Sequence, residues 1–186
     1  RELYRRAEAA SPRTFVNLDM EEYRDLELTL QSFMQVLDEP EFAGIDAGIV
    51  LQAYLPDSHD ALERLGRWAT HRHTEHGGTV KVRLVKGANL AMEAVEADLH
   101  GWVPAPYGSK ADVDASYKAM LESATRPEWA SVLRLGLASH NLFDIAWALT
   151  FGADRGVLDR IEFEMLEGMA PAQARAVHAA AGQLLM

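Results

Sequence analysis

The sequence contains no cysteine, and this absence excludes disulfide bonds, thiolate metal ligands and a cysteine nucleophile. It is also poor in basic residues: 18 Lys and Arg against 28 Asp and Glu give a formal net charge of -10. Such a charge argues against a broad nucleic-acid-binding surface, because phosphates are neutralised by clustered cations, although a local basic pocket stays open. No apolar run is long enough to span a membrane, and the opening RELYRRAEAA lacks the hydrophobic middle of a signal peptide. Together these absences favour a cytoplasmic protein.

Three common catalytic motifs are absent as well. The sequence has no Walker A lysine loop, no GxGxxG after a predicted strand and no GxSxG nucleophile elbow. The motif-based assignments to NTPases, Rossmann dehydrogenases and α/β-hydrolases therefore fail.

What is present is a globular composition with alternating strand and helix patterns. Hydrophobic residues make up 48% of the chain and charged residues 25%. Apolar residues at three-and-four spacing predict helices, for example over 21–39 and 60–72. Short runs rich in Val, Ile and Leu predict strands at 14–18, 47–54, 80–86, 131–139 and 160–166. The alternation favours a parallel sheet covered by helices, in one domain over residues 1–186. Since the chain opens within a helical pattern and without a start methionine, we expect a segment of a longer protein.

Polar residues at the ends of the predicted strands separate two α/β architectures. In a (β/α)8 barrel they converge on one opening at the carboxyl ends of the strands, whereas in a doubly wound sheet the ligand lies at a switch in strand order. Every predicted strand has such residues at its end: Asp19, Gln52, Arg83 with Lys86, His140 with Asn141, and Glu164. Five polar strand ends in register favour the barrel.

Two of these strand ends each allow two interpretations. Arg83 in VKVRLVKGANL forms an internal ion pair with Asp19 or Glu164, or it faces an electron-rich ligand that the KGA backbone can approach closely. In ASHN, at 138–141, Ser139 or Asn141 caps the following helix, and the same helix start is also suited to a phosphate. For ASHN the two interpretations are compatible, whereas for Arg83 both stay open.

The histidines of THRHTEHGG, at 70–78, do not predict a metal site. His71, His73 and His76 lie near Glu75 at the end of a predicted helix, directly before a Gly pair and away from the strand ends. An exposed last helical turn accounts for them better than metal ligation. We therefore predict no bound metal.

Five blocks of the sequence resemble the proline dehydrogenase family: FVNLDMEEY, GIVLQAYL, VRLVKGA, ASHN and EFEMLEGM, in this order. The resemblance covers nearly the whole chain, and RLVKGANLAME is most similar to the large bifunctional bacterial proline utilization proteins. It implies an incomplete (β/α)8 TIM barrel, about strands 3 to 7, with FAD as cofactor. It further implies oxidation of L-proline to Δ1-pyrroline-5-carboxylate, electron transfer to a membrane quinone, and peripheral contact with the inner face of the cytoplasmic membrane.

The same resemblance implies roles for individual residues. Asp19 is expected to be the acidic residue of the active site, and Arg83 the guanidinium beside flavin N5, where it stabilises the charge of reduced flavin. Asn89 and Leu90 depart from the family pattern, since many relatives have aromatic residues there, and Glu164 stands where relatives often have Gln. The residues expected to hold FAD are Val50, Gln52, Arg83, Val85, Lys86, Gly87, Ala88, Ser109, Lys110, Ala138, His140, Asn141, Glu164 and Leu166.

Two family features are absent from these 186 residues: a catalytic Lys on the first barrel strand and a pair of Arg on the last helix. We therefore expect the isolated chain to be inactive. Because a barrel lacking strands exposes two sheet edges, we also expect marginal stability or oligomerisation through those edges. Two alternatives stay open: a non-catalytic α/β module whose strand-end charges form ion pairs and whose edges bind a partner chain, and a barrel that binds a phosphorylated metabolite at ASHN.

Overall fold

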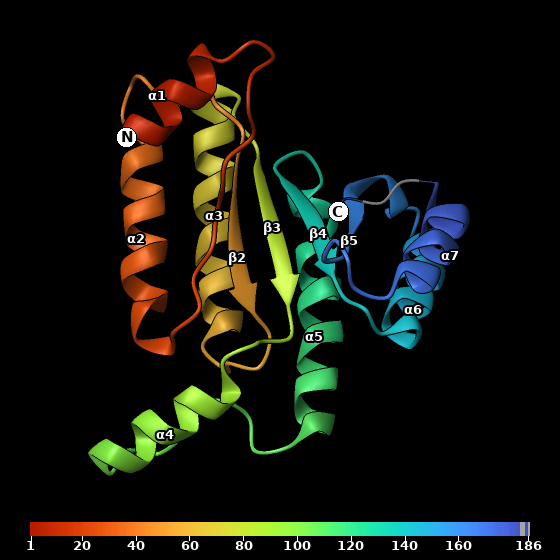
Figure 1. Cartoon of the computed structure of the whole chain (residues 1–186). Helices are drawn as coiled ribbons and strands as arrows, with labels where there is room; N and C mark the ends of the chain where they lie inside the picture. The colour runs from red at the N-terminus through yellow and green to blue at the C-terminus, as the bar shows by residue number, and fades with distance from the viewer. Residues whose placement is uncertain (183–184, 186) are drawn as a thin grey trace.

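The computed structural model describes residues 1–182 and 185, which form a parallel sheet with helices along it (Figure 1). The strands are β1 (Asn17–Leu18), β2 (Ala47–Gln52), β3 (Val80–Val85), β4 (Leu133–Ala138) and β5 (Ile161–Glu164). The α-helices are α1 (Glu2–Ala9), α2 (Leu26–Leu37), α3 (Ser58–His76), α4 (Leu90–His100), α5 (Lys110–Ala124), α6 (Leu142–Arg155) and α7 (Pro171–Ala181). Three 3-10 turns complete the elements: η1 (Tyr23–Asp25), η2 (Pro127–Trp129) and η3 (Leu158–Arg160).

The strand order confirms the barrel prediction. The strands pair in the order β1-β2-β3-β4-β5, and every pairing is parallel. In a doubly wound sheet the order of the strands reverses at a switch point. An unbroken strand order with a helix after each strand is instead typical of the wall of a (β/α)8 barrel. In the described part of the chain β1 pairs on one side only, and Leu185 forms an isolated parallel bridge with Glu164 beyond β5.

The core lies between the sheet and the helices on its outer face. All six residues of β2 are buried, as expected for a strand covered on both sides. Ile49 and Leu51 point outward into a cluster with Phe33 of α2 and Leu65 of α3. Each such side chain contributes about 1.5–3 kcal/mol of hydrophobic stabilisation. The opposite face of β2, with Val50 and Gln52, is left to line the inside of the barrel.

Tertiary contacts shorten two predicted elements. The strand predicted at 14–18 is a strand only at Asn17–Leu18, because β1 has a single partner in the described sheet. The helix predicted to begin at residue 21 begins instead at Leu26, after η1. Tyr23 is held outside the helix, because its backbone N–H donates to Glu93 Oε1 at 2.6 Å and its hydroxyl donates to Asp57 Oδ2 at 2.6 Å.

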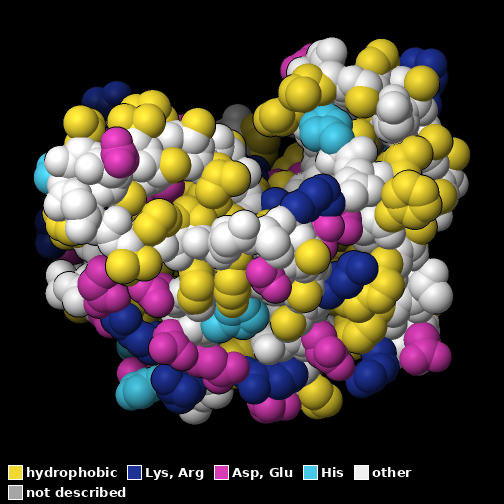
Figure 2. Space-filling view, turned by 90° about the horizontal axis from the view of Figure 1, so that it is seen from below, with side chains coloured by type: hydrophobic (Ala, Val, Ile, Leu, Met, Phe, Trp, Pro, Cys, Tyr) yellow, Lys and Arg dark blue, Asp and Glu magenta, His cyan; other side chains and the backbone are white. Residues whose placement is uncertain are grey.

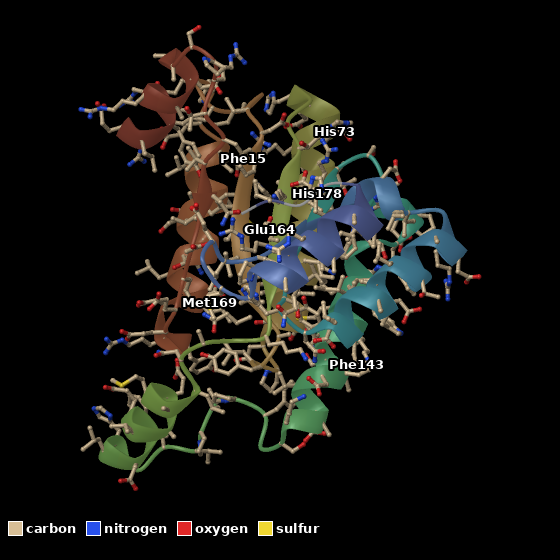
Figure 3. The ribbon with its side chains drawn as sticks, turned by 45° about the vertical axis from the view of Figure 1, so that its right-hand side comes forward. Phe15, His73, Phe143, Glu164, Met169 and His178 are labelled. Carbon is tan, nitrogen blue, oxygen red and sulfur yellow. The ribbon has the colours of Figure 1, made fainter. Side chains whose placement is uncertain are left out.

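The strand ends and the histidine-rich helix end lie on opposite sides of the molecule. The arrowheads of β2 and β3 point down in Figure 1, and α4 projects below them, away from the sheet. Helix α3 runs the other way and ends at Gly77, whose φ of 85° suits a glycine C-cap. His73 is labelled at that far end in Figure 3. Within the described residues, no cluster of three or more potential metal ligands occurs, and no helix is long and apolar enough to cross a membrane.

Candidate functional site

A cavity of about 830 Å³ opens at the carboxyl ends of the strands. From this side the molecular surface is hollowed, with Lys or Arg and His side chains at the rim (Figure 2). All but one of the predicted site residues line it: Asp19, Val50, Gln52, Arg83, Val85, Lys86, Gly87, Ala88, Lys110, Ala138, His140, Asn141, Glu164 and Leu166. A smaller hollow of about 320 Å³ lies between α4 and residues 21–24 and includes none of them.

Ser109 is the predicted residue that does not line the cavity. It is exposed and is the N-cap of α5, where its Oγ accepts a hydrogen bond from Asp112 N at 3.1 Å. A serine at this position satisfies one of the free N–H groups of the first helical turn. The structure thus places Ser109 at the start of α5, next to the cavity residue Lys110.

Arg83 is paired with both carboxylates that the sequence suggested. Its Nε donates to Glu164 Oε2, and its Nη1 lies 3.3 Å from Asp19 Oδ1. Glu164 is buried, whereas the Arg83 side chain keeps 27% of its surface exposed and lines the cavity. The ion-pair interpretation is confirmed, and it leaves the guanidinium accessible to a ligand.

Lys81 is a cation that the sequence reasoning missed. Its Nζ lies 2.6 Å from Glu162 Oε2 and 2.6 Å from Glu164 Oε1, and its side chain is only 8% exposed. The signal was present, because Lys81 precedes Arg83 by two residues on a strand and must share its face. Glu162 and Glu164 have the same spacing on β5. Met20 and Met165 also line the cavity, each directly after a predicted strand-end residue.

Gln52 and His140 each present an unsatisfied polar atom. Gln52 Nε2 donates to Met20 O at 2.6 Å and to Glu21 O at 3.1 Å, so Oε1 is turned away from both carbonyls. His140 Nε2 accepts from Leu166 N at 3.1 Å, which assigns the ring proton to Nδ1. Both Gln52 Oε1 and His140 Nδ1 are buried without a partner among the described residues. Because an unpaired buried polar group costs about 1–3 kcal/mol, an acceptor and a donor in one cavity fit a polar ligand.

Lys86 lies beyond the end of β3 and turns to the helices. Its Nζ pairs with Asp114 of α5 and with Asp144 Oδ2 of α6, the latter at 2.7 Å, and lies 5.5 Å from the centre of the Tyr117 ring. Burial lowers the pKa of Lys86, but hydrogen bonds to the two carboxylates outweigh it and leave that pKa raised. Lys86 therefore joins α5 and α6 at the rim of the cavity.

The packing of Tyr54 explains why residue 87 is a glycine. Its φ is 137°, and a Cβ at this position would lie 2.2 Å from Tyr54 Cδ1. The sequence interpretation made this glycine a means for a ligand to approach the backbone. Packing against Tyr54 requires glycine here whether or not a ligand binds.

The ASHN segment forms the predicted helix cap. Asn141 is the N-cap of α6, and its Oδ1 accepts from Phe143 N at 3.0 Å. Ser139 Oγ accepts from Asn141 N at 3.0 Å. Two backbone donors that would contact a phosphate here are already used by the protein's own side chains.

Comparison with known proteins identifies the family. The family profile described as proline dehydrogenase matches residues 1–186. The chain belongs to the proline dehydrogenase family. Among curated relatives, the bifunctional protein PutA of Klebsiella aerogenes and that of Escherichia coli strain K12 are each 29% identical over 156 residues, which is 83% of this chain and 11% of the relative.

Solved structures of similar proteins have the same fold. Proline utilization A (PutA) from Corynebacterium freiburgense is 53% identical with a TM-score of 0.95, over 100% of this chain and 19% of that one. PutA from Bdellovibrio bacteriovorus inactivated by N-propargylglycine is 34% identical with a TM-score of 0.86, over 94% of this chain and 18% of that one. The chain thus spans less than a fifth of the length of these relatives.

Proposed function

We propose that this chain forms part of the barrel domain of an FAD-dependent proline dehydrogenase. The reaction is oxidation of L-proline to Δ1-pyrroline-5-carboxylate, the first step of proline catabolism. Membership of the family supports the reaction, and the cavity of about 830 Å³ with unpaired Gln52 Oε1 and His140 Nδ1 supports a polar cofactor there. Bound FAD would supply the hydride acceptor for the chemistry.

The residues proposed to hold FAD are those lining the cavity, with Ser109 added at its margin: Val50, Gln52, Arg83, Val85, Lys86, Gly87, Ala88, Ser109, Lys110, Ala138, His140, Asn141, Glu164 and Leu166. Their donors and acceptors suit a heteroaromatic ring with both kinds of polar edge. Gln52 would accept a hydrogen bond through Oε1, and His140 would donate one through Nδ1. Val50 and Val85 contribute apolar surface at neighbouring strand ends.

Arg83 and Asp19 are proposed as the catalytic residues. A guanidinium keeps its charge at any physiological pH, so Arg83 stabilises negative charge that develops beside it in the reaction. Asp19 is largely exposed and accepts hydrogen bonds from Asn17 Nδ2 at 2.9 Å and from Arg83. These contacts fix a carboxylate at the rim of the cavity, where a substrate amine can meet it.

A phosphorylated metabolite at ASHN is less well supported. The capping side chains of Ser139 and Asn141 already occupy backbone donors, and Lys86, the nearby cation, is engaged by Asp114 and Asp144. A non-catalytic module accounts for the ion pairs of Arg83, but it leaves the unpaired atoms of Gln52 and His140 without a purpose. We therefore prefer the flavin-dependent dehydrogenase to both alternatives.

The test uses the full-length gene product that contains these residues, purified with added FAD. We expect a bound flavin spectrum and anaerobic bleaching of the flavin band by L-proline, with glycine as the unreactive control. A protein that binds no flavin, or whose bound flavin is not reduced by L-proline, would contradict the proposal. A membrane quinone as electron acceptor, a cytoplasmic location with peripheral membrane contact, and the inactivity of the isolated 186-residue chain stay predictions.

A further inference from the structure

A line of alternating charges runs along the inner face of the sheet. Lys81 and Arg83 of β3 face Glu162 and Glu164 of β5, although β4 lies between these two strands. The side chains of β3 and β5 meet across β4 because the β4 residue between them, Gly136, has no side chain. A Cβ at this position would lie 2.2 Å from Glu164 Oε1 and 2.8 Å from Lys81 Cε. Any other residue at position 136 would separate the two strands' side chains.

Glu164 divides its two oxygens between two cations. Oε1 lies 2.6 Å from Lys81 Nζ, and Oε2 accepts from Arg83 Nε. The order of groups is therefore Glu162, Lys81, Glu164, Arg83 and Asp19, ending at the rim of the cavity. Lys81 and Glu164 are buried, whereas the side chains at the two ends of the line, Glu162 and Asp19, are 34% and 64% exposed.

The remaining neighbours on this face add one charge. Val50, Gln52, Gly136 and Ala138 are uncharged, and Arg134, in register with Lys81, is exposed and has no ion pair within residues 1–182 and 185. Phe15, labelled with Glu164 in Figure 3, places its ring centre 5.9 Å from Lys81 Nζ. The five groups of the line therefore compensate each other's charge and contact each other in sequence.

We propose that Lys81 is a positioning residue that acts on Arg83 through Glu164, and this role rests on the proposed function. With Lys81 in place, Glu164 Oε1 has a cation 2.6 Å away although it accepts no hydrogen bond, and Arg83 keeps its Nη atoms for Asp19 and for a ligand in the cavity. Without Lys81, the buried Glu164 has Arg83 as its single cation. An undercompensated buried carboxylate draws its remaining partner closer, and this response changes what Arg83 presents to the cavity.

A purely structural salt bridge gives a different expectation. If Lys81 only compensates a buried charge, its loss changes the stability and leaves the properties of a bound flavin alone. If Lys81 positions Arg83, its loss slows flavin reduction by L-proline and shifts the flavin midpoint potential to more negative values, because the cavity loses effective positive charge. Flavin reduction and the midpoint potential are therefore the readouts that separate the two roles.

The experiment compares Lys81→Met, Glu164→Gln, the double variant Lys81→Met/Glu164→Gln, and Arg134→Met in the full-length gene product loaded with FAD. We expect Lys81→Met to reduce the flavin about tenfold more slowly, in the range of coupling between residues in contact. Glu164→Gln changes a residue of the proposed site and should itself be slower than the wild type. In the double variant the carboxylate through which Lys81 acts is gone, so its rate should be within about threefold of that of Glu164→Gln. Arg134→Met removes a cation from the same face without a carboxylate partner and should change neither the rate nor the potential.

The proposal is overturned if Lys81→Met binds FAD and keeps the wild-type rate and potential, or if the Lys81→Met change slows Glu164→Gln as much as it slows the wild type. Should Lys81→Met fail to fold, the double variant decides, because a rate well below that of Glu164→Gln would show that Lys81 does not act through Glu164. Denaturant unfolding of the flavin-free variants gives an independent readout. We expect the losses of unfolding free energy from Lys81→Met and Glu164→Gln to be non-additive, because the two side chains lie 2.6 Å apart. If the wild type binds no FAD, the proposed function fails, while this comparison still tests the action of Lys81 on Glu164.

Discussion

Strand β3 and its end carry two cations that enter different surroundings. Arg83 points to the inside of the barrel, where it pairs with Glu164 and Asp19 and stays accessible from the cavity. Lys86 lies at the rim of the cavity and turns to the helices, where it bridges Asp114 of α5 and Asp144 of α6. Each cation has two carboxylate partners, yet only one of the Arg83 partners is buried, and the other is exposed at the rim. Two cations with similar carboxylate partners therefore have different roles: Arg83 faces the inside of the barrel, and Lys86 attaches two helices to each other.

The largest effect we expect is on the inner side. Arg83→Met should slow flavin reduction by L-proline about 10²–10³-fold, the usual cost of removing one group that stabilises developing charge. Its midpoint of thermal unfolding should also fall, because Lys81 is then the remaining cation of the buried Glu164 and is shared with Glu162. Stopped-flow reduction and calorimetry of the same preparation measure both quantities. Unchanged flavin reduction would show that Arg83 has only an ion-pair role.

The Lys86 pairs should respond differently. Lys86→Met leaves Asp114 and Asp144 without their shared cation, and we expect a loss of about 2 kcal/mol in the free energy of unfolding, below the full cost for a completely buried pair because the Lys86 side chain is 24% exposed. Denaturant unfolding measures this loss. Flavin reduction in the folded variant should fall less than in Arg83→Met. A stable variant with a larger kinetic defect than Arg83→Met would reverse the comparison.

A smaller effect is expected at the helix cap beside the cavity. Asn141→Ala removes the Oδ1 acceptor of Phe143 N, and loss of an N-cap side chain costs about 1 kcal/mol. Asn141→Asp keeps an acceptor and serves as the matched control. If inorganic phosphate stabilised Asn141→Ala more than the wild type in a thermal-shift assay, the helix start would be a phosphate site that its own cap conceals.

The smallest effect concerns pH. Hydrogen bonds from Lys110 and Lys86 lower the pKa of Asp114, so the folded state binds this proton less readily than the unfolded state. The resulting stabilisation is present above the ordinary aspartate pKa and is lost as the pH falls through the lowered value. As the pH falls, Asp114→Asn should therefore lose less free energy of unfolding than the wild type. We expect the difference to be less than about 1 kcal/mol. Denaturant unfolding between pH 6 and pH 3 checks this, and an unchanged slope would show that Asp114 contributes nothing at acid pH.

Local patterns predicted the elements well where burial follows from periodicity. The strand around Val50 and the helix around Leu62 and Leu65 form as expected, because their apolar spacing matches the surface that each element buries. The segment around Tyr23 differs, because its hydrogen bonds go to Glu93 and Asp57, far along the chain. No local pattern contains those partners.

The family resemblance suggested site residues that the structure brings together, while their roles stay predictions. Nearly every residue that it suggested lines the cavity, including Gln52 and His140, whose unpaired atoms no sequence pattern could reveal. It did not suggest Lys81, because the role of Lys81 depends on Glu164 two strands away and on the missing Cβ of Gly136 between them. A period-two pattern on β3 places Lys81 on the inner face but does not choose its partner.

By itself, the sequence determined the alternation of strands and helices and the convergence of polar strand ends, because side-chain periodicity and parallel strand direction are properties of short segments. Tertiary structure alone decided which charges pair. Arg83 and Lys86 are three residues apart, yet they reach different carboxylates because one side chain leaves the strand on the inner face and the other turns to the helices after the strand has ended. The choice of partner depends on strand register and helix packing, and these are settled only when segments distant in the chain come into contact.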